Sequence, residues 1–205
     1  MGLILGKEVE KKFPGLPYAR SMYIDGLMDA LSFGRAYGFP VVIKVISDKL
    51  IHKSDVKAVR IIKNEFELKK ESVSIAAIAK RYDGRIMIQE FVDGFELFVG
   101  VKKDATFGHV IGIGLGGVYV ELLKKVSFRV CPVSKKDVLE MTEESGIKKL
   151  FEGFRGKQAN LEKFVNVTIN ISKIFSRPEI KEVDVNPLIV NEKDAKIVDI
   201  RVVTE

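Results

Sequence analysis

His52 lies in a polar segment, residues 47–55, whose side chains are of the types that handle phosphate. The segment follows the apolar run 40–46, and the neighbours of His52 in it include Lys49, Lys53, Ser54 and Asp55. Ammonium groups bind phosphate oxygens, a hydroxyl donates to them, and a carboxylate orients an imidazole. His52, one of two histidines, is therefore a candidate for phosphoryl chemistry; a surface histidine in a solvated turn is the alternative.

A second group of candidates, rich in oxygen ligands, lies near the C-terminus. Side chains alternate across a strand, so Asp184 and Asn186 share one face of the run 183–187. Asp199 projects from the run 197–201 in the same way. If the two strands pair antiparallel, these oxygens converge on a hard cation such as Mg²⁺, which takes one or two protein oxygens and fills its other positions with water and phosphate. Polar residues facing solvent from a one-sided sheet are the alternative.

Four other charged residues are candidates for contact with a ligand. Lys44 lies inside an apolar strand, where its ammonium needs an anion or, by snorkelling from a sheet edge, water. Glu90 and Glu96 flank a turn and have the groups to bond a ribose or an adenine, or are merely solvated. Arg129 either clamps a phosphate or pairs with Glu121.

The glycine-rich run 112–117 lacks the Gly-Lys-Ser/Thr ending of a Walker A loop and is not placed as a dinucleotide fingerprint. Its glycines still allow close approach of the backbone to a ligand, or a sharp bend. His109, beside this run, has no acidic or basic neighbour and is interpreted as structural.

Composition describes an ordinary globular chain of 205 residues, with 46% hydrophobic and 30% charged residues and a net charge of +6. The lysines are spread along the chain without interleaved aromatics, which argues against nucleic acid as a partner. The single cysteine, Cys131, excludes an intramolecular disulfide. With no signal-peptide pattern and no apolar run of membrane-spanning length, we expect a cytoplasmic protein without a membrane partner.

Periodicity predicts helices and strands in loose alternation. Helices are expected over 27–37, ended by Gly38, over 65–81, from a Ser134 cap to 144, and over 161–175. Strands are expected over 41–46, 56–62, 85–92, 96–101, 109–118, 126–130, 180–190 and 197–203. Asp93-Gly94 signals a hairpin or a hinge. Hairpins are too frequent for a parallel sheet, so the pattern favours an α+β chain of two lobes, with the hinge near residues 89–94.

Taken together, these segments resemble an ATP-grasp domain, and specifically the nucleotide-binding β subunit of ADP-forming acyl-CoA synthetases (acetate–CoA ligases). The resemblance rests on six separated matches that run in family order between about Tyr18 and Val203, which is far more specific than any one match. They are Gly38-Phe-Pro-Val-Val-Ile-Lys44, Ile51-His-Lys-Ser-Asp-Val56, Gln89-Glu-Phe-Val with Glu96-Leu-Phe-Val-Gly100, Gly114-Leu-Gly-Gly-Val-Tyr-Val-Glu121, Val126-Ser-Phe-Arg129, and Glu182-Val-Asp-Val-Asn-Pro-Leu188 with Asp199.

The resemblance implies an ATP-grasp fold, two α/β lobes with the nucleotide site between them. It implies an N-terminal segment 1–17, a small lobe 18–88 and a large lobe 89–205. The family reaction is acyl-CoA + ADP + phosphate ⇌ acid + CoA + ATP, passing through phosphohistidine. The resemblance implies contact with the ATP phosphates for Lys44 and lining of the adenine for Glu90, Phe91 and Val92. It implies ribose binding for Glu96, and Mg²⁺ ligation for Asn186 and Asp199 with Asp184 beside them. It implies catalysis for His52 with Arg129.

The chain departs from the family pattern after His52, where Lys57-Ala58 replaces the usual Gly-Gly. Lys125 stands where aspartate is usual, and the segment before Tyr18 is short. No CoA-binding half is recognisable, so we expect a separate α subunit and, by resemblance, a heterotetramer. Two alternatives remain: a non-catalytic ATP-grasp binding or scaffolding module, and an ATP-grasp ligase with a carboxylate substrate, which the His-Lys-Ser-Asp match disfavours.

Overall fold

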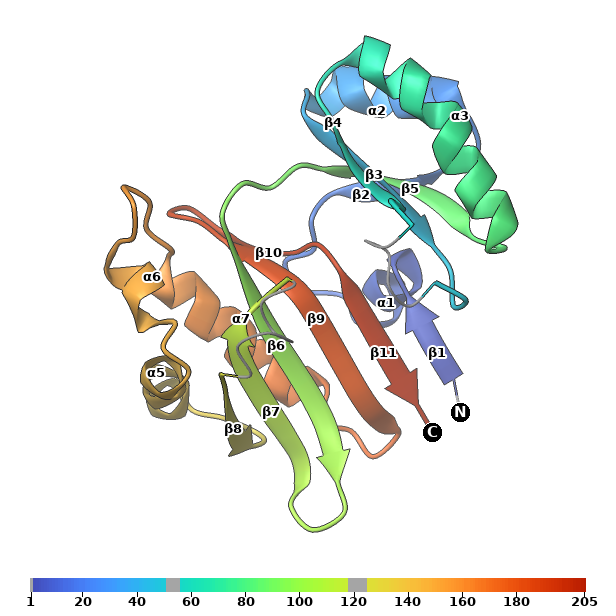
Figure 1. Ribbon diagram of the computed structural model, residues 1–205. Coiled ribbons are helices and arrows are strands. Elements are labelled where there is room, and N and C mark those ends of the chain that lie inside the picture. The colour runs from blue at the N-terminus through green and yellow to red at the C-terminus, as the bar shows by residue number, and fades with distance from the viewer. Residues whose placement is uncertain (1, 51–55, 118–124) are drawn as a thin grey trace. The chain divides into compact units, whose positions relative to one another are not determined.

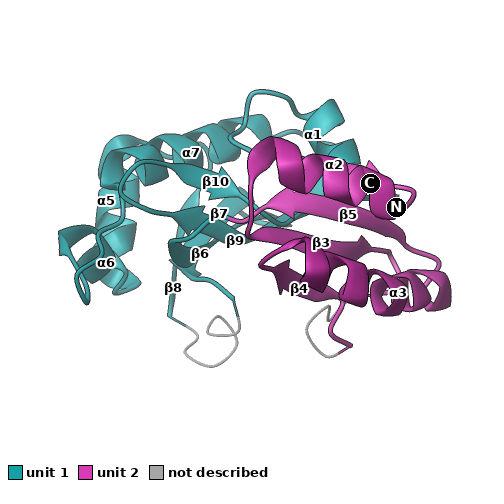
Figure 2. Cartoon of the chain, turned by 90° about the horizontal axis from the view of Figure 1, so that it is seen from above, with its two compact units in different colours: residues 1–18, 92–205 teal, residues 19–91 magenta. Residues whose placement is uncertain are grey.

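The computed structural model describes residues 2–50, 56–117 and 125–205. The chain forms two compact units: residues 1–18 with 92–205 form unit 1, and residues 19–91 form unit 2 (Figure 2). No helix among the described residues is long and apolar enough to cross a membrane.

Unit 2 is an antiparallel four-stranded sheet with two helices on one face (Figure 1). Its strands stand in the order β2-β5-β3-β4. Side chains from the helices and from one face of the sheet make a core that includes Leu31, Ile43, Leu68 and Ile88. The elements are β2 (Ser21–Ile24), α2 (Leu27–Tyr37), β3 (Val41–Ile46), β4 (Val59–Ile62), α3 (Glu65–Arg81) and β5 (Arg85–Glu90).

Local signals fix the helices of unit 2 as predicted. Gly38, with φ of 85°, ends α2, and the side chain of Asn64 accepts a hydrogen bond from the Glu67 amide at the start of α3. The predicted ranges 27–37, 41–46 and 65–81 are confirmed. The four-residue strand β2 was not predicted, because so short a run shows little periodicity.

Unit 1 is a seven-stranded antiparallel sheet whose main path runs β1-β11-β9-β6-β7-β8, with β10 paired to β9. Helices α5 and α7 pack on one face (Figure 1). The strands are β1 (Gly2–Leu5), β6 (Phe95–Asp104), β7 (Gly108–Leu115), β8 (Val126–Val130), β9 (Ile180–Val190), β10 (Ala195–Ile197) and β11 (Ile200–Thr204). The helices are α1 (Lys7–Lys12), α5 (Lys135–Glu144), α6 (Lys148–Glu152) and α7 (Leu161–Ile174).

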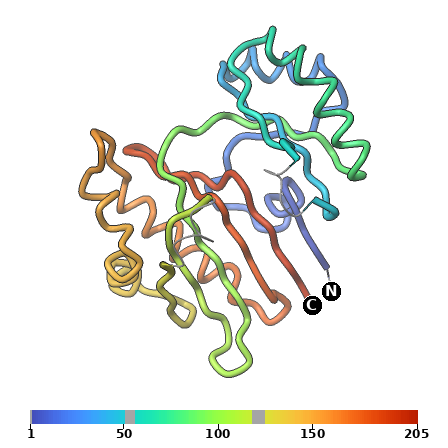
Figure 3. Tube along the Cα trace, in the orientation of Figure 1, coloured from blue at the N-terminus to red at the C-terminus, as the bar shows by residue number. Residues whose placement is uncertain are grey.

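The N-terminal residues belong to unit 1, although the sequence suggested a separate segment 1–17. β1 pairs antiparallel with β11, so the two ends of the chain lie side by side (Figure 3). The buried ring of Phe13 packs on that of Phe175, with centroids 4.8 Å apart. Burial of apolar side chains therefore packs the N-terminal segment onto the core. The two residues in this contact are far apart in sequence, so local periodicity does not predict it.

The α+β prediction is confirmed, since every ladder between named strands is antiparallel and helices cover one face of each sheet. The hairpin alternative for Asp93-Gly94 is wrong, because β5 and β6 belong to different sheets. The division between the units falls between Phe91 and Val92, inside the expected hinge region.

Candidate functional site

In unit 2, Lys44 lies on the sheet face opposite the helices. Its ammonium donates to Gln89 Oε1 at 3.1 Å, and both side chains are only 5% exposed. β3 lies between β5 and β4, so a lysine snorkelling from a sheet edge is excluded. A buried ammonium is stabilised by anionic ligands, and Lys44 therefore suits contact with a phosphate.

The residues expected to line an adenine, Glu90, Phe91 and Val92, follow directly along the chain. Glu90 is anchored to Arg20: its amide donates to the Arg20 carbonyl, and its Oε1 accepts from the Arg20 amide, both at 2.9 Å. The carboxylate of Glu90 thus has a structural task that the sequence did not suggest. Phe91 is 37% exposed.

In unit 1, Glu96 and Asn186 converge on the end of the glycine-rich run. The amide of Gly117 donates to Asn186 Oδ1 at 2.8 Å, and the amide of Gly116 donates to the Glu96 carbonyl at 2.8 Å. Gly117 has φ of 63°, and a β-carbon there would lie 2.1 Å from Glu96 Oε2. This run, weak as a phosphate-loop signal, therefore joins the candidate ribose ligand to a candidate metal ligand.

The antiparallel pairing of the C-terminal strands is confirmed, with Val185 opposite Ile200. The amide of Asn186 donates to the Asp199 carbonyl at 3.2 Å, which brings these two residues together. Along β9, Asp184 and Asn186 alternate with buried valines, as predicted. Among the described residues no three His, Cys, Asp or Glu side chains form a metal site by themselves. Two carboxylates and an amide oxygen nevertheless suit Mg²⁺, which keeps several water or phosphate ligands.

Arg129 is not brought to this group. It pairs with the core residue Ile111, so its side chain leaves the sheet on the helix-covered face, whereas Asp184 and its row leave on the other. Its guanidinium binds Glu144 of α5 through two bonds, Nη1 to Oε2 at 2.9 Å and Nη2 to Oε1 at 2.5 Å. Glu140 lies 3.5 Å away, while Glu121 is outside the described residues.

We predict that the ion pair between Arg129 and Glu144 makes the free energy of unfolding depend on pH in the acidic range. Bonds from Arg129 and then Ser127 lower the pKa of Glu144 from 4.5 to about 2. The Glu144 carboxylate binds a proton more readily in the unfolded chain than in the folded one. Its contribution to the free energy of unfolding is therefore complete above pH 4.5 and is lost as the pH falls towards 2. Glu144→Gln should therefore flatten the fall in the free energy of unfolding over this range, measured by denaturant titration at each pH.

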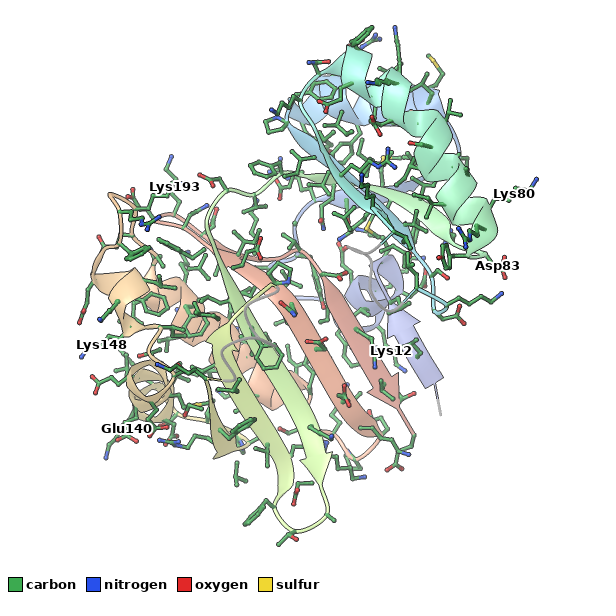
Figure 4. All side chains as sticks on the ribbon, in the orientation of Figure 1. Lys12, Lys80, Asp83, Glu140, Lys148 and Lys193 are labelled. Carbon is green, nitrogen blue, oxygen red and sulfur yellow. The ribbon has the colours of Figure 1, made fainter. Side chains whose placement is uncertain are left out.

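Glu140→Gln is the matched control, because Glu140 (labelled in Figure 4) lies on the same helix and at a longer distance from the same guanidinium. It should change the acid dependence less. Equal profiles for the two variants would contradict the assignment of the effect to Glu144.

His52 lies in residues 51–55, outside the described part of the chain. The chain after it is described, and there Lys57 has φ of 54°. This left-handed conformation suits glycine, the residue that the family resemblance leads one to expect. Arg60 Nε donates to the Lys57 carbonyl at 3.2 Å, and Val45 donates to the Ala58 carbonyl at 2.9 Å. The backbone at this position therefore keeps a glycine-like path with a lysine in it.

Lys57→Gly is accordingly expected to leave the free energy of unfolding unchanged or to raise it by up to about 1 kcal/mol. A non-glycine residue in the left-handed conformation costs about 1–2 kcal/mol, which glycine would relieve. Glycine also has more conformational freedom in the unfolded chain, and this offsets part of the gain. Ala58→Gly is the control. Ala58 is fully buried without a positive φ, so glycine there should lower stability, by about 1 kcal/mol. Urea unfolding of both variants measures the difference, and a clear loss in Lys57→Gly would contradict the strain.

Comparison with known proteins identifies the family. The family model described as an ATP-grasp domain matches residues 7–204. The chain belongs to the ATP-grasp family. Its fold is thus the one that the six ordered motifs implied.

The chain is 36% identical to the β subunit of ADP-forming acetate–CoA ligase I from Pyrococcus furiosus, over 96% of this chain and 88% of the relative. It is 37% identical to ADP-forming acetate–CoA ligase I from Archaeoglobus fulgidus, over 91% of this chain but only 28% of that longer protein. Acetyl-coenzyme A synthetase 1 of Candidatus Korarchaeum cryptofilum, in complex with coenzyme A, Ca-AMPCP and HgCl⁺, superposes with a TM-score of 0.89 at 36% identity, covering 99% of this chain and 93% of that one.

Sequence reasoning missed three residues of these sites. Gln89, which binds the Lys44 ammonium, was quoted only within a motif. Gly117 was treated as part of a weak glycine run, and Arg20 as no site residue. Strand alternation offered a signal for Gln89, which shares a sheet face with Lys44 once β3 and β5 are paired.

Proposed function

We propose that this chain is the nucleotide-binding β subunit of an ADP-forming acyl-CoA synthetase. It would transfer a phosphoryl group between ATP/ADP and a histidine, as part of the reaction acyl-CoA + ADP + phosphate ⇌ acid + CoA + ATP. The relatives with this architecture support the reaction class. The observation that carries the site assignment is the convergence of Glu96 and Asn186 on Gly117.

The roles follow from the chemistry of each side chain. Lys44 would bind the nucleotide phosphates, Glu96 a ribose hydroxyl, and the segment 90–92 the adenine. Asp184, Asn186 and Asp199 have the oxygen donors that would hold Mg²⁺. When bound, Mg²⁺ neutralises phosphate charge, which together with positioning is most of what phosphoryl transfer requires.

His52 would carry the phosphoryl group on the nucleotide side. Towards ATP, the bond between the imidazole nitrogen and phosphorus breaks, a bond from phosphorus to the terminal oxygen of ADP forms, and the imidazole leaves as a neutral base. Towards ADP, the imidazole attacks the γ-phosphorus and the bridging oxygen leaves with ADP. A catalytic role for Arg129 would require its guanidinium to exchange Glu144 for phosphate and to act from the other face of the sheet.

The partner we propose is a CoA-binding α subunit that carries the main phosphohistidine, in a cytoplasmic hetero-oligomer. The support is the length comparison: the chain spans 88% of a relative named as a β subunit but 28% of a longer relative with the same activity in its name. The longer protein has room for a CoA-binding half beside the part that matches this chain.

The experiment is a labelling assay. The purified chain is mixed with Mg²⁺, γ-labelled ATP and each candidate CoA-binding chain, and label is sought on this chain. Phosphohistidine is stable in base and lost in acid, so label with those properties supports the proposal. ATP binding without label under any pairing would favour the alternative of a non-catalytic module, against which the glycine-like path at Lys57 already argues.

A further inference from the structure

The residue after the proposed adenine-lining segment, Asp93, is held to unit 1 from two sides. Lys157 Nζ donates to both carboxylate oxygens of Asp93, at 2.8 and 3.1 Å. Asn191 Nδ2 donates to the Asp93 carbonyl at 2.8 Å. The next residue, Gly94, packs closely on the neighbouring strand, because a β-carbon there would lie 2.7 Å from the Val190 carbonyl oxygen. The backbone at Asp93 is therefore closely constrained.

Lys157 comes from a tight turn between α6 and α7 (Figure 1). Phe154 and Lys157 exchange backbone bonds of 2.8 and 3.1 Å across Arg155 and Gly156, which both have positive φ, 51° and 76°. Such two-residue turns are rigid, and positive φ in a non-glycine residue is a strained conformation that tends to occur at functional sites. The turn sets the backbone position from which the Lys157 side chain reaches Asp93.

Asn191 is held with equal definition in the turn between β9 and β10. Its Oδ1 accepts from the amides of Lys193 and Asp194 at 3.0 and 2.9 Å. Its own carbonyl accepts at 2.8 Å from the amide of Asn160, the N-terminal cap of α7. With Oδ1 occupied in this way, the amide nitrogen of the side chain is directed at Asp93.

Val92 is the residue of the adenine-lining segment that belongs to unit 1, and it directly precedes Asp93. We infer that Lys157 and Asn191 are positioning residues for an adenine nucleotide: by holding Asp93 they hold the backbone of Val92, the part of the segment in unit 1, ready for the base. The inference rests on the proposed function. Preorganising a binding segment removes the cost of ordering it when the ligand arrives.

The ion pair between Lys157 and Asp93 is exposed to solvent. Its side chains are 60% and 68% exposed, and exposed ion pairs add little to folding stability. Loss of the pair should therefore appear in nucleotide affinity and hardly at all in thermal stability. A merely structural contact would show the opposite pattern.

The test is calorimetric titration of the whole chain with Mg·ADP and Mg·ATP. Lys157→Met and Asp93→Asn should each raise Kd about two- to fivefold, the ratio that corresponds to the free energy of an exposed ion pair, and the double variant should go no further than the larger single one. Lys157→Arg, which keeps the positive charge, should keep the wild-type affinity for both nucleotides. Lys193→Met is the matched control, because Lys193 (labelled in Figure 4) is an exposed cation of the neighbouring turn whose side chain makes no ion pair among the described residues.

An unchanged Kd in Lys157→Met, or additive effects in the double variant, would overturn the inference. A Tm loss in Lys157→Met without a change in Kd would assign the pair to folding alone and overturn it as well. Failure of the wild-type chain to bind either nucleotide is a separate result, which refutes the proposed function and with it this inference.

Discussion

His52→Ala is expected to lower phosphoryl transfer in the reconstituted enzyme about a thousandfold or more, because the proposed relay between ATP and the phosphohistidine of the α subunit passes through this imidazole. Binding of Mg·ATP should stay within about twofold of wild type, since the contacts assigned to the nucleotide come from other residues. Single-turnover transfer of labelled phosphate measures the first quantity, and calorimetry measures the second.

His109→Ala is not a suitable control, because His109 Nε2 lies 2.9 Å from the Ile180 carbonyl and its loss would disturb the sheet. His52→Gln is better, since it keeps a polar side chain of similar length but cannot be phosphorylated on nitrogen as imidazole is. If either variant at His52 still transfers phosphate at the wild-type rate, the residue is not the acceptor.

Gly117→Ala should cost the chain most of its nucleotide affinity. The added β-carbon would meet Glu96 Oε2 at 2.1 Å, so either the carboxylate or the turn must move, and Asn186 loses its fixed partner if the turn moves. We expect Kd for Mg·ATP to rise about tenfold to a hundredfold, since overpacking costs about 1–3 kcal/mol. The loss of binding free energy should exceed any loss in the free energy of unfolding.

Gly146→Ala separates this clash from backbone strain. Gly146 also has a positive φ, 75°, but a β-carbon there would meet nothing within 4 Å. This variant should lose some stability and retain nucleotide affinity. Equal losses of affinity in both would show that strain, and not the contact with Glu96, explains the result at Gly117.

The sequence predicts most of the elements that place these residues, because both helices of unit 2 and strand β3 bury regular apolar patterns. It also predicts which face Asp184 and Asn186 share, since alternation along β9 is strict there. Contacts such as Gly117 with Asn186 join residues 69 apart in sequence and lie beyond any local pattern. The catalytic role expected of His52 stays a prediction, because residues 51–55 lie outside the described part of the chain.

Arg129 illustrates a way in which a hydrophobic pattern misleads. Phe128 and Val130, its apolar neighbours, suggest that the arginine turns away from the core. In fact Phe128 is 61% exposed, and a β-carbon at Gly112 would lie 2.8 Å from its ring, so the aromatic side chain covers a glycine on the open face of the sheet. Arg129 accordingly faces the helices, where Glu144 stabilises it.

The pairing of β1 with β11 has a consequence for how the chain folds during synthesis. Gly2 pairs with Thr204, so β1 has its partner strand only after β11, at the other end of the described sequence, has been made. Unit 2 is encoded by one continuous stretch, residues 19–91, and can fold as soon as that stretch leaves the ribosome. Long-range pairing of this kind slows folding. Truncation of the last strand should therefore leave a nascent chain with a folded small unit and an unfinished large one.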